Sequence, residues 1–304
     1  MSTRPRPPVI VGVDGSACSM RALDVAATEA AQRKRPLQVI HAFRWPILFT
    51  PLGATPEPDP RVHATAVTAA AVERARAAQP GLEVTTSIID GGPVDRGPAA
   101  VLVHASDAAS LVVVGHRGTG GFANLLAGSV SVQVATHAQC PVIVVRDEPV
   151  AHAAAEPAVV VGVDGSELSA QAVWFAFEEA SFRSMPLIAI QVLEPAAGTH
   201  AAPTTTPPHR NDAATAYAHR ILADALAPAR ARHPDVAVKS EVVEAKTPQQ
   251  ALIDASEGAT MVVVGPRGRG GFRGLLFGSV SQAVLHHAHC PVALVRNYTR
   301  TARP

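Results

Sequence analysis

Residues 112–131 read VVVGHRGTGGFANLLAGSVS, and residues 262–281 read VVVGPRGRGGFRGLLFGSVS. Each copy begins with an apolar run typical of a buried strand, continues through closely spaced glycines, and ends in small and hydroxyl residues that favour a helix start. A glycine-rich loop ahead of a helix can bring backbone N–H groups close to an anion. The stretch therefore predicts a strand, an anion-binding loop and a helix, formed twice.

The repeat extends over most of the chain. IVGVDGS at 10–16 returns as VVGVDGS at 160–166, and Pro36, Pro98 and Cys140 have counterparts 150 residues later. A fixed offset over that length predicts two copies of one domain, because solenoid repeats are far shorter. We expect the first domain to span residues 1–147 and the second 158–304, with an Ala- and Pro-rich linker at 148–157.

Within each copy, apolar runs alternate with helical patterns. In the first copy we expect strands at residues 9–13, 37–43, 83–89, 111–114 and 141–145, and helices at 17–34, 61–79, 98–106 and 125–137. The proline-rich stretch 44–60 is expected to be a loop. Strands that alternate with helices predict a parallel sheet covered on both faces. The fold class is therefore α/β, with two tandem doubly wound domains, each a five-stranded parallel sheet.

Ligands of doubly wound sheets bind at the carboxyl ends of the strands, near the point where the strand order reverses. Asp14 and the loop after Gly115 both follow strands, so we expect them to face one crevice. The loop lacks the Gly-Lys-Ser/Thr of a Walker A motif, and it does not follow the first strand, as a dinucleotide fingerprint would. A capping role for Asp14, in which the carboxylate never touches a ligand, remains an alternative.

Composition excludes several other classes of protein. The 304 residues carry a formal net charge of +1, which gives no sign of a nucleic-acid binder. No run reaches the ~18 apolar residues of a membrane span, and the N-terminus does not resemble a signal peptide. The three cysteines do not suggest a disulfide framework, so we expect a cytoplasmic protein that binds neither nucleic acid nor membrane.

Metal and catalytic sites find little support in the sequence. Residue types that can bind a metal gather at the end of the second copy, at His286, His287, His289 and Cys290. The first copy has Thr136, His137, Gln139 and Cys140 in their place. A shared zinc site would keep its ligands, so we expect no metal site and small buried cysteines. His41 and His116 are matched by Gln191 and Pro266, which leaves no base common to both copies. We therefore predict no catalytic residue.

Three separated motifs occur in the same order in both copies: VDGS, Gly115-x2-Gly118-x9-Gly128-Ser129 with its counterpart Gly265-x2-Gly268-x9-Gly278-Ser279, and CPV. Together they resemble the universal stress protein family, in its tandem-domain, ATP-binding form. The resemblance covers nearly the whole chain apart from the termini and the linker. It implies Rossmann-like domains of the adenine nucleotide alpha hydrolase type, each binding one ATP, with Mg²⁺ bridging the phosphates.

The resemblance also assigns roles to single residues. In the first domain, Asp14 and the backbone of Gly12 and Val13 would lie against the adenine, Ala42 would meet the base through its backbone, and Gly115 would border the ribose; Gly118, Gly128, Ser129, Val130 and Ser131 would hold phosphates. In the second domain these roles fall to Asp164, Gly162, Val163, Val192 and Gly265, and to Gly268, Gly278, Ser279, Val280 and Ser281. The predicted sites also include the remaining loop residues His116, Arg117, Thr119, Gly120 and Gly121, and Pro266, Arg267, Arg269, Gly270 and Gly271.

The two loops differ in charge. The second carries Arg267, Arg269 and Arg273, whereas the first carries Arg117 alone. Arginines can grip phosphates, so we hypothesise that the second site holds a triphosphate more tightly. Solvated surface arginines are the competing interpretation.

The favoured function is a regulatory nucleotide sensor in a stress response or growth control, read by an unidentified protein partner. Strands 141–145 and 291–295 resemble the family's dimerisation edge, which implies a pseudo-dimer within the chain and a homodimer through sheet-edge strands. Two alternatives stay open. The protein could be a slow ATPase or phosphotransferase of the same superfamily, or a scaffold that binds no nucleotide.

Overall fold

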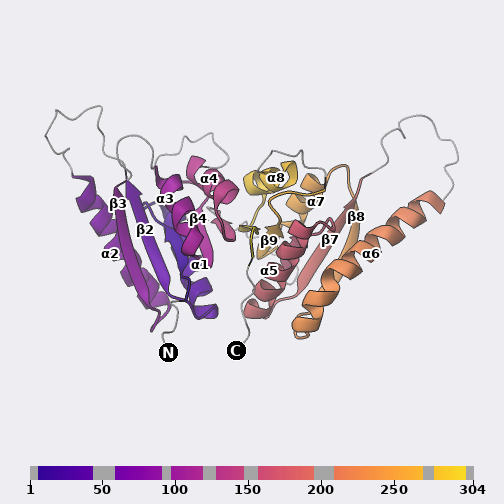
Figure 1. Ribbon diagram of the computed structural model, residues 1–304, viewed down its shortest axis with the longest axis horizontal. Helices are drawn as coiled ribbons and strands as arrows, with labels where there is room; N and C mark the ends of the chain where they lie inside the picture. Colours follow the sequence, from indigo (N-terminus) through magenta and orange to yellow (C-terminus); the bar gives the residue numbers. More distant parts are fainter. Residues whose placement is uncertain are drawn as a thin grey trace. The chain divides into compact units, whose positions relative to one another are not determined.

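The computed structural model describes residues 6–43, 59–90, 97–118, 128–146, 157–194, 209–269 and 277–298. The chain divides into two compact units, Met1–Glu148 with Thr301–Pro304, and Pro149–Arg300. Apart from a short 3₁₀ turn in the first unit, strands and helices follow one another in the same order in both units. Figure 1 labels most of these elements. The domain boundaries at 147 and 158 stay a prediction.

The first unit contains β1 (Val9–Gly12), α1 (Ala17–Gln32), β2 (Leu37–Phe43), α2 (Pro60–Ala78), β3 (Val84–Asp90), α3 (Pro98–Ala105), β4 (Leu111–Gly115), α4 (Ser129–His137) and β5 (Val142–Val145), with a short 3₁₀ turn at Ser106–Ala108. Its strands lie in the order β3-β2-β1-β4-β5. Neighbouring strands pair in parallel throughout.

The second unit repeats this arrangement. It contains β6 (Val159–Gly162), α5 (Glu167–Arg183), β7 (Leu187–Leu193), α6 (His209–Arg232), β8 (Val238–Glu244), α7 (Pro248–Ala255), β9 (Met261–Val264), α8 (Ser279–His287) and β10 (Val292–Leu294). The strand order is β8-β7-β6-β9-β10, again with parallel pairs. The predicted fold class, two tandem five-stranded parallel sheets, is confirmed.

The strand order fixes where a ligand can bind. In the first unit the chain runs outward from β1 to β3 and then crosses back to β4 on the other side of β1. Right-handed crossovers place α1 and α2 on one face of the sheet and α3 and α4 on the other, and each of these pairs of helices packs together. The order reverses between β1 and β4, so the carboxyl ends of these two strands border the switch point.

Apolar burial and side-chain caps explain the local structure. Val9, Ile10 and Val11 of β1 are almost fully buried, as expected of a strand covered on both faces. Ser16 caps α1 by accepting a hydrogen bond from the Ser19 N–H, at 3.1 Å. In the second unit Ser166 does the same for α5. The DGS turn is therefore a helix start in both units.

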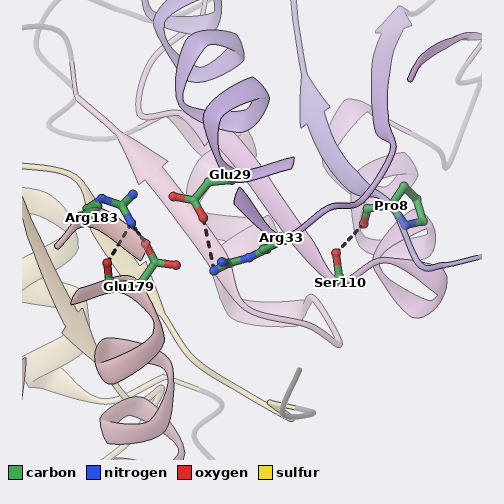
Figure 2. Close-up of polar contacts among 6 residues, drawn as sticks. All are labelled: Pro8, Glu29, Arg33, Ser110, Glu179 and Arg183. Atoms are coloured by element: carbon green, nitrogen blue, oxygen red, sulfur yellow. Dashed lines mark hydrogen bonds and ion pairs between the residues drawn. The ribbon is translucent and has the colours of Figure 1, made fainter. Parts of the chain in front are cut away.

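Figure 2 shows polar contacts that support these elements. Glu29 of α1 forms an ion pair of 3.2 Å with Arg33, the C-cap of this helix, and Glu179 and Arg183 repeat the pair in α5. The Ser110 hydroxyl donates to the Pro8 carbonyl at 2.9 Å, which ties the starts of the neighbouring strands β4 and β1. Such contacts satisfy polar groups that the core would otherwise leave without partners.

Two expectations about element positions are wrong. The last helix was expected to run from residue 125, but α4 begins at Ser129, because Gly128 has an extended backbone (ψ 149°) and serves as the N-cap. The offset of 150 also fails in one region: Leu37 pairs with Val84 and Leu187 with Val238, an offset of 154 for the outer strands. The connection from β8 to α7 is correspondingly shorter than that from β3 to α3, which restores the offset of 150 at Pro248.

The described part of the chain contains neither a membrane-spanning helix nor a cluster of metal ligands. No helix there is both long and apolar enough to span a membrane. Within the same ranges, no group of three or more His, Cys, Asp or Glu side chains could hold a metal ion. The three cysteines are buried, without disulfides.

Candidate functional site

The acidic residue after the first strand of each unit holds the turn that follows it. In the first unit the Ser16 N–H donates to Asp14 Oδ1 at 3.0 Å. In the second unit the Ser166 N–H donates to Asp164 Oδ1 at 2.9 Å. Asp14 and Asp164 therefore brace the DGS turns, and this role is compatible with contact to a ligand.

Asp164 also holds the glycine loop, more than 100 residues away in the sequence. Its Oδ2 accepts a hydrogen bond from the Arg269 N–H at 2.7 Å. Burial opposes the ionisation of Asp164. Hydrogen bonds from Ser166 and Ser169 and from the Arg269 N–H outweigh burial, so the pKa of that carboxyl lies below its ordinary value of 3.8. The charged carboxylate thus links the turn after β6 to the loop after β9 through hydrogen bonds to both segments.

The close approach of these two segments requires glycine. A Cβ at Gly268 would stand 2.7 Å from Asp164 Oδ2, and one at Gly118 would collide with Asp14 Oδ2. Any side chain at either position would displace the carboxylate or the loop. The second glycine of each Gly-x2-Gly is therefore required for steric reasons, which the spacing in the sequence did not reveal.

The second part of each motif begins a helix. Gly278 donates its N–H to the Pro266 carbonyl at 2.8 Å, and Gly128 donates to the His116 carbonyl at 2.6 Å. Neither glycine provides a side-chain cap, and the first helical bonds come from Val132 and Gln282. The N–H groups of the first turn, at 129–131 and 279–281, precede these bonds and point toward the helix N-terminus, where anions are stabilised.

The serines of this turn have different tasks. The Ser131 hydroxyl donates to the His116 carbonyl at 3.1 Å, and the Ser281 hydroxyl donates to the Gly265 carbonyl at 2.6 Å. Both serines are buried. Their hydroxyl hydrogens thus fasten the helix to the preceding strand end, while Ser279 accepts a hydrogen bond from Gln249 Nε2.

A cavity of about 380 Å³ lies at the carboxyl ends of β6, β7 and β9. The predicted residues that line it are Gly162, Val163, Asp164, Val192, Gly265, Arg267, Gly268, Arg269, Gly278, Ser279, Val280 and Ser281. Pro266 is not among them, and Gly270 and Gly271 lie outside the described residues. Most of the second predicted site therefore surrounds one cavity of a size usual for a small-molecule pocket.

Other residues of the cavity were not anticipated from the sequence. They come from β7, β9 and the helices α5 and α7, and from the residue after β7: Ser169, Ile190, Gln191, Glu194, Pro248, Gln249, Leu252 and Val264. Leu252 packs close to Gly162, where a Cβ would stand 2.9 Å from Leu252 Cδ1. Pro248 at the start of a helix was a usable signal, because a helix that begins at this edge of the sheet faces the crevice.

The first unit reproduces the frame of this site. Gly12 packs against Leu102 as Gly162 does against Leu252. Gly115 lies against the backbone of Cys18, and Cys18 Sγ is 3.4 Å from His116 Nδ1. Val13 donates its N–H to the carbonyl of Ile40, in the middle of β2, and His41 and Ala42 follow Ile40 in that strand. Thr119, Gly120 and Gly121 lie outside the described residues.

Positive charge is gathered near the second loop. Burial lowers the pKa of Arg296, and the positive charge of Arg267 lowers it further. Arg267 lines the cavity. The Arg269 guanidinium lies over the turn at Gly165, where its Nη2 is 2.5 Å from the place of a Cβ. Of the three arginines in the hypothesis of a tighter second site, Arg273 lies outside the described residues.

Comparisons with known proteins agree with the duplicated architecture. A model of the universal stress protein family matches residues 6–146 and again residues 157–296. Universal stress protein Rv2005c of Mycobacterium tuberculosis is 38% identical over 297 residues, which cover 95% of this chain and 96% of that protein.

Solved structures are similar as well. A universal stress protein from Archaeoglobus fulgidus covers 96% of this chain and 97% of its own, with 20% identity and a TM-score of 0.66. Another from that organism, solved in complex with dAMP, covers 45% of this chain and 96% of its own, with 27% identity and a TM-score of 0.35. On the two domain matches and the near full-length relative, the chain belongs to the universal stress protein family and contains two of its domains in tandem.

Proposed function

We propose that each domain binds one adenine nucleotide, ATP with Mg²⁺, and that a regulatory protein partner reads nucleotide occupancy during a stress response or growth control. The observation that carries the proposal is the cavity of the second domain. There the carboxylate of Asp164, the glycine loop and the first turn of α8 meet at the switch point of the sheet.

The cavity has the chemistry that a nucleotide needs. The N–H groups that begin α8 and the guanidinium of Arg267 provide donors for phosphate oxygens. Ile190, Val192 and Leu252 provide apolar surface for a base. Mg²⁺ would neutralise the phosphates and be held by their oxygens. These groups bind and orient, and they are consistent with a sensor.

Nucleotide content is the most direct test. Freshly purified protein is denatured, and the released small molecules are quantified by mass spectrometry. We expect two adenine nucleotides per chain, or uptake of two equivalents of MgATP in a calorimetric titration. A protein that carries none and takes up none would be the scaffold of the alternative interpretation.

Single-site variants assign the two equivalents. Gly118→Asp and Gly268→Asp each place a second carboxylate against an existing one, so each should remove one binding equivalent. Ala223→Asp, on an exposed position of α6, is the matched control and should retain both. Two equivalents in either glycine variant would contradict the assignment of the loops to the sites.

A steady-state assay separates sensor from enzyme. With Mg²⁺ and excess ATP, we expect turnover far below about 1 s⁻¹, the lower end of ordinary enzymes. Faster turnover that falls in each glycine variant, and disappears when the two substitutions are combined, would favour the ATPase alternative.

We further propose that the protein acts in the cytoplasm and that two chains associate through sheet-edge strands. Light scattering with and without MgATP would report the mass of the assembly. A single-chain mass at micromolar concentration in both conditions would contradict the homodimer.

A further inference from the structure

Another cavity lies in the first domain, at the opposite end of the strands from the candidate nucleotide site. Its volume is about 530 Å³, which is within the usual range of small-molecule pockets. Its wall includes Pro36, which directly precedes β2, and Glu83, which directly precedes β3. The cavity therefore opens at the amino ends of these strands, whereas a nucleotide is expected at the carboxyl ends.

The charged side chains in the wall of this cavity are mostly basic. Among the described residues that line it, Arg6, Lys34 and Arg35 contribute three cations, and Glu83 contributes one carboxylate. Arg6 and Lys34 are exposed, and Arg35 is half-buried. Within the part of the chain that the structure describes, none of these three cations forms an ion pair. Positive charge that lines a cavity in excess over negative charge attracts anions.

The backbone brings these basic residues together. Lys34 follows the C-cap of α1 and has a left-handed backbone, with φ 52°. Its N–H donates to the Ala31 carbonyl at 3.1 Å, and the Arg35 N–H donates in the same turn to the Ala30 carbonyl at 2.9 Å. Arg6 Nη1 donates to the Lys34 carbonyl at 3.2 Å, which joins the segment before β1 to this turn. The turn after α1 thus gathers all three cations on one side of the cavity.

The second domain shows that this turn does not require positive charge. Cations near a helix C-terminus can stabilise the helix dipole without any ligand. α5 ends in the same kind of turn, with Ser184 at φ 52° and the Met185 N–H bonded to the Ala180 carbonyl at 3.0 Å. Ser184 and Met185 stand where the first domain has Lys34 and Arg35, and both are uncharged. The end of the helix therefore does not explain the two cations.

We propose that this cavity of the first domain binds a small multivalent oxyanion, whose phosphate or carboxylate oxygens accept hydrogen bonds from Arg6, Lys34 and Arg35. Guanidinium and ammonium groups donate to both kinds of oxyanion. A ligand with at least two negative charges balances three cations and one carboxylate. The inference goes beyond the proposed function and does not rest on it, because the cavity lies away from the strand ends assigned to the nucleotide.

Calorimetric titration of the full chain with pyrophosphate and with citrate, at low ionic strength, tests the site and separates the two oxyanion chemistries. Lys34→Gly removes one cation while glycine readily adopts the left-handed backbone of this turn, so the variant should fold. We expect Lys34→Gly and Arg35→Met each to weaken the more tightly bound anion about fivefold. Glu83→Gln should strengthen the binding of the same anion, because it removes the carboxylate from the cavity wall.

Arg76→Met is the matched control. Arg76 lies in the last turn of α2, is exposed, and is not one of the residues that line the cavity. The variant loses the same charge as Arg35→Met, so it reports how much of any effect comes from the net charge of the protein. We expect its affinity for either anion to stay within about twofold of the wild type, because distant exposed charges are screened by salt.

Hydrogen exchange identifies where the anion binds, because pyrophosphate could also enter the nucleotide pockets. In the wild type, the more tightly bound anion should slow amide exchange in residues 30–37 and 79–84, which border the cavity. This protection should be absent when Lys34→Gly and Arg35→Met are combined. Residues 112–118 serve as the internal reference, because they report on the nucleotide site of the same domain.

The inference is overturned if neither anion slows exchange in these two segments, or if the protection persists in the combined variant. Unchanged affinity in both Lys34→Gly and Arg35→Met, or an equal loss in Arg76→Met, would likewise mean that the cavity does not bind the anion. Weaker binding in Glu83→Gln would contradict the predicted effect of its charge. Failure to bind adenine nucleotides would refute the proposed function alone and leave these results unchanged.

Discussion

Replacing Asp164 with asparagine tests whether one carboxylate holds the turn after β6 and the glycine loop together. The carboxylate accepts two backbone N–H groups, from Ser166 at 2.9 Å and from Arg269 at 2.7 Å. Asparagine retains one acceptor oxygen and turns an NH₂ group toward the other donor. One hydrogen bond to a charged acceptor is lost, and such bonds contribute about 1.5 to 3 kcal/mol. We therefore expect Asp164→Asn to lower the free energy of unfolding of the second domain by about 2 to 3 kcal/mol at pH 7.

The effect should depend on pH in a defined direction. The folded-state pKa of Asp164 lies below the ordinary value of 3.8, so the unfolded chain takes up the proton first as the pH falls. The stability that this carboxylate contributes is complete above its ordinary pKa and is lost as the pH drops through the folded-state pKa. The gap between wild type and Asp164→Asn should therefore be widest at neutral pH and shrink below pH 3.8.

A single tryptophan makes the assay specific for the second domain. The chain has two tryptophans, Trp45 and Trp174, and Trp174 lies in α5. In a Trp45→Phe background, urea unfolding followed by fluorescence reports on α5. Asp254→Asn is the matched control, because Asp254 accepts from Gln250 on an exposed helix surface and should cost less than about 1 kcal/mol. A loss of stability below about 0.5 kcal/mol in Asp164→Asn, or a difference in stability from the wild type that grows in acid, would show that Asp164 does not hold the turn and the loop together.

Three further predictions concern buried groups. Burial lowers the pKa of His41 from 6.5, so the unfolded chain takes up the proton first as the pH falls. Between pH 7 and pH 5, urea titrations should therefore show a smaller loss of stability for His41→Gln than for the wild type. An equal loss in the two proteins would contradict this prediction. Burial raises the pKa of Cys140 to about 12, so a disulfide reagent at pH 8 should leave Cys140 unmodified in native protein and react with it only after denaturation; rapid native labelling would oppose this. Leu252→Ala should destabilise the second domain by about 2 to 4 kcal/mol, since Leu252 is 4% exposed; a change below about 1 kcal/mol would mean that the site collapses around the cavity.

The fold could be predicted because the chain states its pattern twice. Short apolar runs such as Val9–Gly12, which alternate with longer helical patterns, are typical of a parallel α/β sheet. The start of α4 was missed, because the apolar residues before Gly128 continue a helical pattern, whereas an extended Gly128 ends it. Boundaries of this kind depend on backbone conformation, which the pattern of side chains does not contain.

The candidate site was predicted where it consists of loops in the motif and missed where it consists of neighbours in space. Asp14, Asp164 and the glycine loops could be identified because they follow strands with a repeated spacing. Gln249 and Leu252 could not, because α7 reaches the cavity through the crossover from β8, and the residue that corresponds to Gln249 in the first domain is Ala99, which has no polar side chain. A prediction that relies on residues shared by the two halves of the chain misses a residue that occurs in one half alone.

Corresponding residues of the two domains lie 150 positions apart in most elements, but 154 apart in β3 and β8. The difference shows that the length of a connection can change while the strands stay the same. Only three residues, 245–247, join β8 to α7, whereas seven, 91–97, join β3 to α3. Both of these connections leave carboxyl ends of strands, while the strand pairing itself keeps the same register in the two sheets. A chimera with residues 245–247 in place of 91–97 should therefore fold as before, because both connections join the same pair of elements.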